Sequence, residues 1–179
     1  IMKYRFDTVS GKLVPEKNKD IRVPAGSGPR HFFFSDDGGR MYLINELGST
    51  VMVYDTGGYK MPVLLQILPA TSGDYSGSNA CAEIHAAKDF RFIYGSNRGE
   101  NSIVVFRTGK DGLHTQARRV ACGGDWPRSF AVHPSGRFMV VANQRSGELS
   151  VFRINGKTGM PEGPVYKCIS PEPSCVGFF

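Results

Sequence analysis

One pattern occurs three times along this chain of 179 residues, and it limits the folds that the chain can adopt. Each copy contains a strand-like run, a polar turn with Gly or Asp, a second strand that ends in Asn, and a third strand with alternating apolar side chains. The copies start at Arg30, Glu83 and Arg128, and their second strands end at Asn45, Asn97 and Asn143. Helical periodicity is absent from nearly the whole sequence, so we expect an all-β protein.

A spacing of roughly 50 residues between copies, with short β-branched and aromatic strands, is typical of a β-propeller built from four-stranded antiparallel blades. We expect the last two strands of a preceding blade in residues 1–28 and the first strand of a further, ring-closing blade in residues 174–179. Between them we expect three whole blades, in residues 29–80, 81–126 and 127–173. A β-sandwich also has short strands at regular spacing, but the threefold repeat argues against it.

The 22 Lys and Arg residues against 16 Asp and Glu give a net charge of +6, which can indicate an anionic partner. Because the basic residues are scattered and only Arg118 and Arg119 are adjacent, the sequence lacks the basic arm or stripe that binds nucleic acid. A small anionic ligand fits this distribution better. No apolar run approaches the length that spans a membrane, so we expect no membrane partner.

The four cysteines include neither a CxxC pair nor a Cys/His spacing that holds zinc. With so few cysteines and no secretory signal, we expect reduced thiols in a cytoplasmic protein. Glu46 and Glu83 are the two carboxylates that we expect near the propeller axis, which is too few for a metal cluster. We therefore expect no metal and no other cofactor.

In an antiparallel meander, the start of the first strand and the end of the second strand lie on the same rim of the blade. Polar residues of this sequence gather at both positions. They are Arg30, His31, Glu83, His85 and Arg128 at first-strand starts, and Asn45, Glu46, Asn97, Arg98, Asn143 and Gln144 at second-strand ends. We expect a concave polar site near the axis, suited to a small anion that carries hydroxyl groups.

Each of these residues also has a structural interpretation. The three asparagines can cap turns through their side chains, and we favour this role because every copy has one. A histidine near a strand start, such as His31 or His85, is often a satisfied core residue. Glu46 has no counterpart in the other copies, which argues against a role in the repeat itself. His114 and His133 are expected to be surface turn residues.

Six short motifs contain the rim residues, in the order Gly28-Pro29-Arg30-His31, Asn45-Glu46-Leu47, Ala82-Glu83-Ile84-His85, Ser96-Asn97-Arg98-Gly99, Pro127-Arg128-Ser129-Phe130-Ala131 and Val141-Ala142-Asn143-Gln144. Together they resemble the seven-bladed β-propeller lactonase family, which includes propeller-type 6-phosphogluconolactonases and fungal carboxy-muconate cyclases. The resemblance covers essentially the whole chain. Three whole blades and two partial ones are about half of such a ring, so it implies that the chain is a C-terminal half whose partner is the missing N-terminal half.

The resemblance implies a metal-independent lactonase, a carboxylic-ester hydrolase that converts 6-phosphogluconolactone to 6-phosphogluconate in the pentose phosphate pathway of carbohydrate metabolism. By motif, the family's arginine falls on Arg30 and its glutamate on Glu46. For lactone hydrolysis we expect Glu46 to act as the base and Arg30 as the electrophile or oxyanion partner, with His85 also catalytic. We expect the substrate to be bound by Arg98 and Arg128, which would clamp its phosphate, and by His31, Glu83, Asn97 and Gln144.

Two alternative functions remain open at this point. One is a lactonising isomerase that acts on carboxy-muconate, in which Glu and His move a proton and the arginines bind carboxylates. The other is a non-catalytic propeller that binds a partner protein. An exposed apolar patch on the rim, with Arg30 and Glu46 paired only to each other, would favour that second alternative.

Overall fold

The structure, a computed structural model, describes residues 1–16, 20–57 and 61–178, and every regular element in them is a strand. Three four-stranded antiparallel sheets follow one another, and in each the strands pair in sequence order. Their strands are β3 (Pro29–Phe34), β4 (Arg40–Asn45), β5 (Thr50–Asp55), β6 (Val63–Pro69), β7 (Ala80–Ala86), β8 (Phe92–Arg98), β9 (Ser102–Thr108), β10 (His114–Ala121), β11 (Pro127–Val132), β12 (Phe138–Asn143), β13 (Glu148–Ile154) and β14 (Pro161–Ile169).

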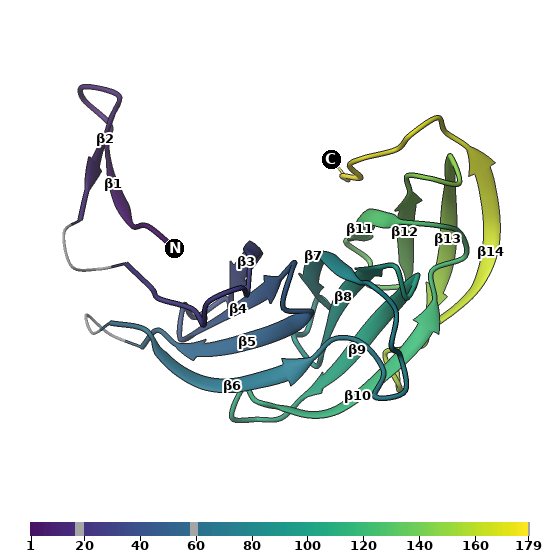
Figure 1. Ribbon diagram of the computed structural model, residues 1–179, viewed down its shortest axis with the longest axis horizontal. Coiled ribbons are helices and arrows are strands. Elements are labelled where there is room, and N and C mark those ends of the chain that lie inside the picture. Colours follow the sequence, from purple (N-terminus) through teal and green to yellow (C-terminus); the bar gives the residue numbers. More distant parts are fainter. Residues whose placement is uncertain (17–19, 58–60, 179) are drawn as a thin grey trace.

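The three sheets are propeller blades arranged along an arc, as the repeat predicts (Figure 1). We call β3–β6 the first blade, β7–β10 the second and β11–β14 the third. The first strands β3, β7 and β11 lie on the concave side of the arc, and β7 contacts both of the others. The fourth strands lie on its convex side (Figure 1). The second blade begins at Ala80, one residue before the expected boundary.

The two ends of the chain differ in how they meet the blades. Strands β1 (Tyr4–Asp7) and β2 (Lys12–Pro15) form a two-stranded antiparallel sheet, within the segment expected to hold two strands. Further along, Ile21 and Val23 join Ile1 against the outer apolar face of the first blade. Residues 174–178 belong to no strand, and residue 179 lies outside the described residues. A first strand of a further blade in this segment stays a prediction.

Apolar side chains from both faces of a blade hold the blades together. Because successive side chains of a strand point to opposite faces, Ile93 packs toward the first blade and its neighbour Tyr94 toward the third. The middle strands are therefore buried on both sides. Full burial of one such Ile or Phe side chain contributes about 1.5–3 kcal/mol, so the stability of each blade depends on its neighbours.

The repeated asparagines link the blades through hydrogen bonds. Asn97 Nδ2 donates to Ala70 O at 2.9 Å, which lies where the first blade ends, and to the Ser102 hydroxyl at 3.0 Å. Asn143 Nδ2 does the same with Cys122 O at 3.2 Å and the Ser150 hydroxyl at 3.1 Å. All these asparagine side chains are buried. The favoured structural role is thus confirmed, and the bond reaches beyond a turn to the preceding blade.

A tyrosine in the second strand of the first blade and another in that of the second blade make corresponding bonds at the opposite rim. The Tyr42 hydroxyl donates to Gly112 O at 3.0 Å, and the Tyr94 hydroxyl donates to Gly159 O at 2.9 Å. Gly159 has a φ of +71°, and a Cβ at this position would lie 2.3 Å from the Phe92 ring. The turn between β13 and β14 can approach the second blade only because residue 159 has no side chain.

His114 is buried, and the expectation that it is a surface turn residue is wrong. Its side chain lies between blades, with its ring centroid 5.1 Å from that of Phe106 and 5.4 Å from that of Tyr42. Burial lowers the pKa of His114 to about 4. The imidazole was expected at the surface because its turn position is polar, but β10 begins at His114 and carries the ring into the interface. By contrast, His133 lies in a turn as expected, where it bonds Ser135.

Gly159→Ala is expected to lower the free energy of unfolding by about 1–3 kcal/mol more than Gly136→Ala, the cost of overpacking. Both glycines have a φ of +71°, but an alanine at 136 would have only Lys88 Cβ nearby, at 3.8 Å. The two variants therefore share the backbone strain and differ in the contact with Phe92. Urea denaturation measures the difference, and equal losses would show that the ring moves aside without cost.

Stability is expected to fall on acidification because His114 resists protonation only while folded. The unfolded imidazole takes up a proton near pH 6.5, whereas the folded one does so at about pH 4. Between these values the unfolded state binds more protons, so wild type should lose about 2 kcal/mol more than His114→Gln between pH 7.5 and pH 5. Urea denaturation at both pH values measures this loss. His133→Gln should behave as wild type does, and an equal loss in His114→Gln would contradict the prediction.

Candidate functional site

The structure brings most of the predicted polar residues together on one rim. Arg30 and His31 lie in β3, and Glu83 and His85 lie in the neighbouring β7. Glu46 directly follows β4, and Arg98 ends β8. The rim therefore combines side chains of the first and second blades, as meander topology predicts.

Glu46 lies between two guanidinium groups. Its Oε1 accepts a hydrogen bond from Arg98 Nη2 at 2.5 Å, and its Oε2 is 3.6 Å from Arg30 Nε. The backbone is held as well, because Glu46 N donates to Gly28 O and Glu46 O accepts from Cys81 N. The side chain remains 36% exposed, so solvent reaches a carboxylate whose direction is set by both blades.

Arg98 is a buried partner of Glu46. The residue is only 4% exposed. Its Nε donates to Ala80 O at 3.2 Å and its Nη2 to Cys81 O at 3.1 Å, while its guanidinium lies 5.4 Å from the centroid of the Trp126 ring. The burial that fixes Glu46 also removes Arg98 from the surface and argues against the expected role in a phosphate clamp, which stays a prediction.

Arg30 contacts Glu46 and also His31, the partner of Glu83. Its Nη1 donates to Ala82 O at 2.6 Å and lies 3.3 Å from both ring nitrogens of His31. Burial lowers the pKa of Arg30, the neighbouring Arg98 acts in the same direction, and Glu46 and Glu83 oppose both. A guanidinium keeps its charge despite such a shift, so Arg30 remains a cation that can stabilise an oxyanion.

Glu83 and two histidines form a second group beside Glu46. Glu83 Oε1 lies 2.6 Å from His31 Nδ1 and 3.9 Å from His85 Nε2, and Oε2 accepts a bond from the Ser129 hydroxyl at 3.4 Å. Burial lowers the pKa of His85, with Glu83 opposing and His31 reinforcing the shift. His85 is therefore a neutral imidazole at neutral pH, able to accept a proton.

The remaining predicted residues have different surroundings. Arg128 is partly exposed and, within the described part of the chain, its side chain has no ion pair or hydrogen bond. It lies close enough to Arg30 for its charge to lower that residue's pKa. Gln144 is partly exposed, and its backbone N donates to Trp126 O at 3.0 Å. Asn97 is fully buried in its links between blades, which argues against the expected contact with substrate, and that contact stays a prediction.

Trp126 and Ser129 are two residues of the site that sequence reasoning did not assign to it. The Trp126 ring lies between Arg98 and Arg145, whose guanidinium carbon is 3.3 Å from the ring centroid. Such cation–π contacts hold both arginines in place. The signal for Trp126 was its position directly before the Pro127-Arg128 motif, whereas nothing in the sequence singles out Ser129 for bonding with Glu83.

Residues 1–16, 20–57 and 61–178 contain no group of three or more His, Cys, Asp or Glu side chains that could hold a metal ion. The same residues include no helix with the length and apolar character needed to cross a membrane.

Comparison with known proteins gives consistent matches. Residues 1–178 match the family model described as lactonase, 7-bladed beta-propeller. A curated relative from Yersinia pseudotuberculosis, named 6-phosphogluconolactonase, is 35% identical over 156 residues, which are 86% of this chain and 47% of the relative. A relative of the same name from Serratia proteamaculans is 32% identical, over 84% of this chain and 46% of its own. The chain thus spans about half the length of these curated relatives.

Solved structures agree with the arrangement of the blades. The periplasmic gluconolactonase PpgL of Pseudomonas aeruginosa superposes with a TM-score of 0.89 at 32% identity, covering 96% of this chain and 48% of PpgL. A protein from Lactobacillus plantarum superposes with a TM-score of 0.88 at 30% identity, covering 97% of this chain and 50% of that protein. The predicted half of a seven-bladed ring is confirmed as the architecture of this chain.

Arg98→Met and Arg128→Met are expected to differ in stability although both remove one positive charge. The first variant removes the side-chain donors to the carbonyls of Ala80 and Cys81 and the closest partner of Glu46, which should cost at least about 2 kcal/mol. The second removes a partly exposed side chain without partners among the described residues, so a change within about 0.5 kcal/mol is expected. Urea denaturation compares them, and equal stability would contradict the supporting role of Arg98.

Proposed function

The chain belongs to the seven-bladed β-propeller lactonase family, and on this premise we propose that the complete protein hydrolyses 6-phosphogluconolactone to 6-phosphogluconate. The observation that carries the proposal is the Glu46 carboxylate, held between Arg98 and Arg30 yet open to solvent. Arg128 lies nearby with no partner among the described residues, so a guanidinium is available for the substrate's anion. The name shared by the curated relatives supports this substrate.

We propose that an N-terminal half supplies the remaining blades of the ring. The chain spans about half of its relatives, and one face of the first blade carries exposed aromatic side chains. Phe33 packs toward the second blade, so Phe32 and Phe34 point the opposite way, where they are 46% and 50% exposed. A further blade against this face would bury both rings, as each described interface between blades does.

In the proposed reaction, Glu46 accepts a proton from a water molecule as the water oxygen attacks the lactone carbonyl carbon. Arg30 donates hydrogen bonds to the carbonyl oxygen, which becomes negatively charged. When the ring C–O bond breaks, the proton on Glu46 passes to the departing ring oxygen, which becomes a hydroxyl group. The new carboxylic acid then loses its own proton to solvent, and Glu46 is again a carboxylate.

The neighbouring groups would bind the rest of the substrate. Arg128 presents a planar set of donors suited to a phosphate group. The Glu83 carboxylate, with His31 beside it, can accept hydrogen bonds from sugar hydroxyls, and Gln144 can donate or accept. As a neutral imidazole, His85 can assist the proton transfer to the departing oxygen.

We propose a cytoplasmic location, because all four cysteines are free thiols, which persist where the compartment is reducing. The structural relative PpgL is described as periplasmic, so the compartment needs its own measurement. Cell fractionation with detection of the native protein provides it, and recovery from the periplasm would contradict this location.

Glu46→Gln is expected to lower kcat/KM for 6-phosphogluconolactone at least about 100-fold, because an amide cannot take the proton from water.

Arg128→Gln is expected to raise KM about 10-fold or more for this substrate and to have little effect on uncharged gluconolactone, since it removes a partner of the phosphate. Rates are measured in the full-length protein after subtraction of spontaneous ring opening.

Arg5→Gln, on the exposed hairpin of β1 and β2, is the matched control for loss of charge and should behave as wild type. Unchanged kinetics in Glu46→Gln would remove its role as base. Equal effects of Arg128→Gln on both lactones would show that Arg128 does not bind the phosphate. Turnover of carboxy-muconate instead of 6-phosphogluconolactone would support the isomerase alternative. The binding-module alternative would be favoured if Arg30 and Glu46 were paired only to each other, but Arg30 also bonds Ala82 O and Glu46 also bonds Arg98.

A further inference from the structure

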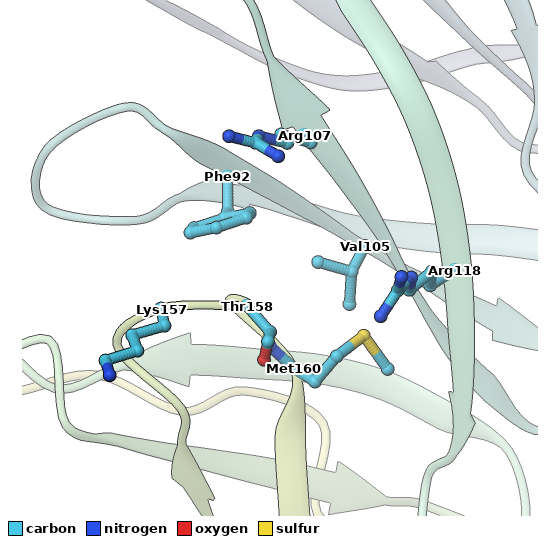
Figure 2. Close-up of a pocket in the computed structure, with 7 residues that line it drawn as sticks. All are labelled: Phe92, Val105, Arg107, Arg118, Lys157, Thr158 and Met160. Atoms are coloured by element: carbon cyan, nitrogen blue, oxygen red, sulfur yellow. The ribbon is translucent and has the colours of Figure 1, made fainter.

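The two interfaces between blades differ at the rim opposite to Glu46. Between the second and third blades lies a cavity of about 100 Å³, lined by Phe92, Val105, Arg107, Arg118, Lys157, Thr158 and Met160 (Figure 2). Phe92 begins β8 and Arg98 ends it, so this cavity is separated from the rim site by roughly 20 Å, the length of that strand. It therefore belongs to a different part of the molecule.

The equivalent place between the first and second blades is closed by neutral hydrogen bonds and an ion pair. Gln66 Nε2 donates to His114 O and His114 N donates to Gln66 Oε1, both at 2.9 Å. The His114 ring fills the space beside Tyr42. Arg40 and Asp55, opposite one another in the sheet, form an ion pair at 3.4 Å.

The register identifies what replaces each of these groups in the next interface. Arg118 pairs with Val105 as Gln66 pairs with Val53, and Phe92 lies opposite Arg107 as Arg40 lies opposite Asp55. The second interface thus has the guanidinium of Arg107 where the first has the carboxylate of Asp55. It has the guanidinium of Arg118 where the first has the neutral amide of Gln66.

The histidine is replaced as well. Pro161 follows Gly159 by two residues, as His114 follows Gly112, and both glycine carbonyls accept the interblade tyrosine bond. A proline has neither a backbone N–H nor an imidazole ring, so the contacts that close the first interface cannot form here.

Three cations surround this cavity without a balancing carboxylate among its lining residues. In the part of the chain that the structure describes, the side chains of Arg107, Arg118 and Lys157 form no ion pair or hydrogen bond, and all three residues are exposed. Figure 2 shows Arg118 directed toward Met160, and Arg107 beside the Phe92 ring. The Thr158 hydroxyl accepts a bond from Met160 N, so its own hydrogen is free to bond a ligand.

We propose that this cavity is a second anion site that binds a dianionic phosphate group. Two guanidinium groups and a hydroxyl are strong donors to phosphate oxygens, and Lys157 adds positive charge at the cavity edge. The volume of about 100 Å³ is enough for one phosphate group but not for a whole phosphorylated sugar, since sites for complete metabolites have about 300 Å³ or more. The bound group is either inorganic phosphate or the phosphate of a metabolite whose remainder lies outside.

The test is a titration of the protein with inorganic phosphate at constant ionic strength, followed by NMR at the backbone amides of Thr158 and Gly159. Saturable shifts of these amides are expected, together with at least a tenfold weaker affinity in Arg118→Gln, which restores the residue of the closed interface. Arg5→Gln carries the same charge change on the distant β1 strand and should bind as wild type does. Linear shifts without saturation, or equal weakening in both variants, would overturn the proposal.

Two further measurements distinguish binding at this cavity from binding at the rim and identify the source of the phosphate. The amides of Glu83 and Ser129 report binding near Arg128, and Arg128→Gln should leave the affinity seen at Thr158 unchanged. If Arg128→Gln abolishes the Thr158 shifts, phosphate binds at the rim alone and the proposal fails. Tighter binding of glucose 6-phosphate than of inorganic phosphate would support a metabolite, and the reverse would support the free ion.

Discussion

The middle strands of each blade have two apolar faces, and the packing of those faces between blades fixes the positions of all other groups. Ile93 and Tyr94 are neighbours in β8, yet they join the cores of different interfaces. One blade by itself would leave both faces in water, which is why this architecture needs neighbours on either side. The Asn97 and Asn143 bonds at one rim and the Tyr42 and Tyr94 bonds at the other then set how far the blades can turn against each other.

The rim site is a consequence of this packing. Removing a guanidinium such as that of Arg98 from water is costly unless acceptors satisfy its N–H groups and a negative charge balances its own. Here two backbone carbonyls and the Glu46 carboxylate accept its hydrogen bonds, and Glu46 supplies the negative charge. Because Glu46 follows β4 and Arg98 ends β8, the pair forms only where two blades meet. The same burial that stabilises the pair directs the carboxylate toward solvent, where a base is useful.

Repetition allows one backbone arrangement to hold different chemistry at successive interfaces. At the first interface, two reciprocal hydrogen bonds between the Gln66 side chain and the His114 backbone close the space between the blades. At the second interface Arg118 and Pro161 occupy the same positions, and a cavity results whose cations have no side-chain partner in the part of the chain that the structure describes. The backbone tolerates the change because the Tyr94 bond and the close approach of Gly159 to Phe92 hold the turn in place.

The blades, their order and the rim on which Arg30, Glu46 and Glu83 meet could all be predicted from the sequence, because alternation and turn chemistry act over a few residues. Which polar groups face solvent depends instead on how the blades pack. Arg98 and His114 were both expected at the surface from the sequence, yet each is buried against a segment of another blade. Burial depends on partners roughly 50 residues away in a repeat of this period, and no local pattern records what those partners cover.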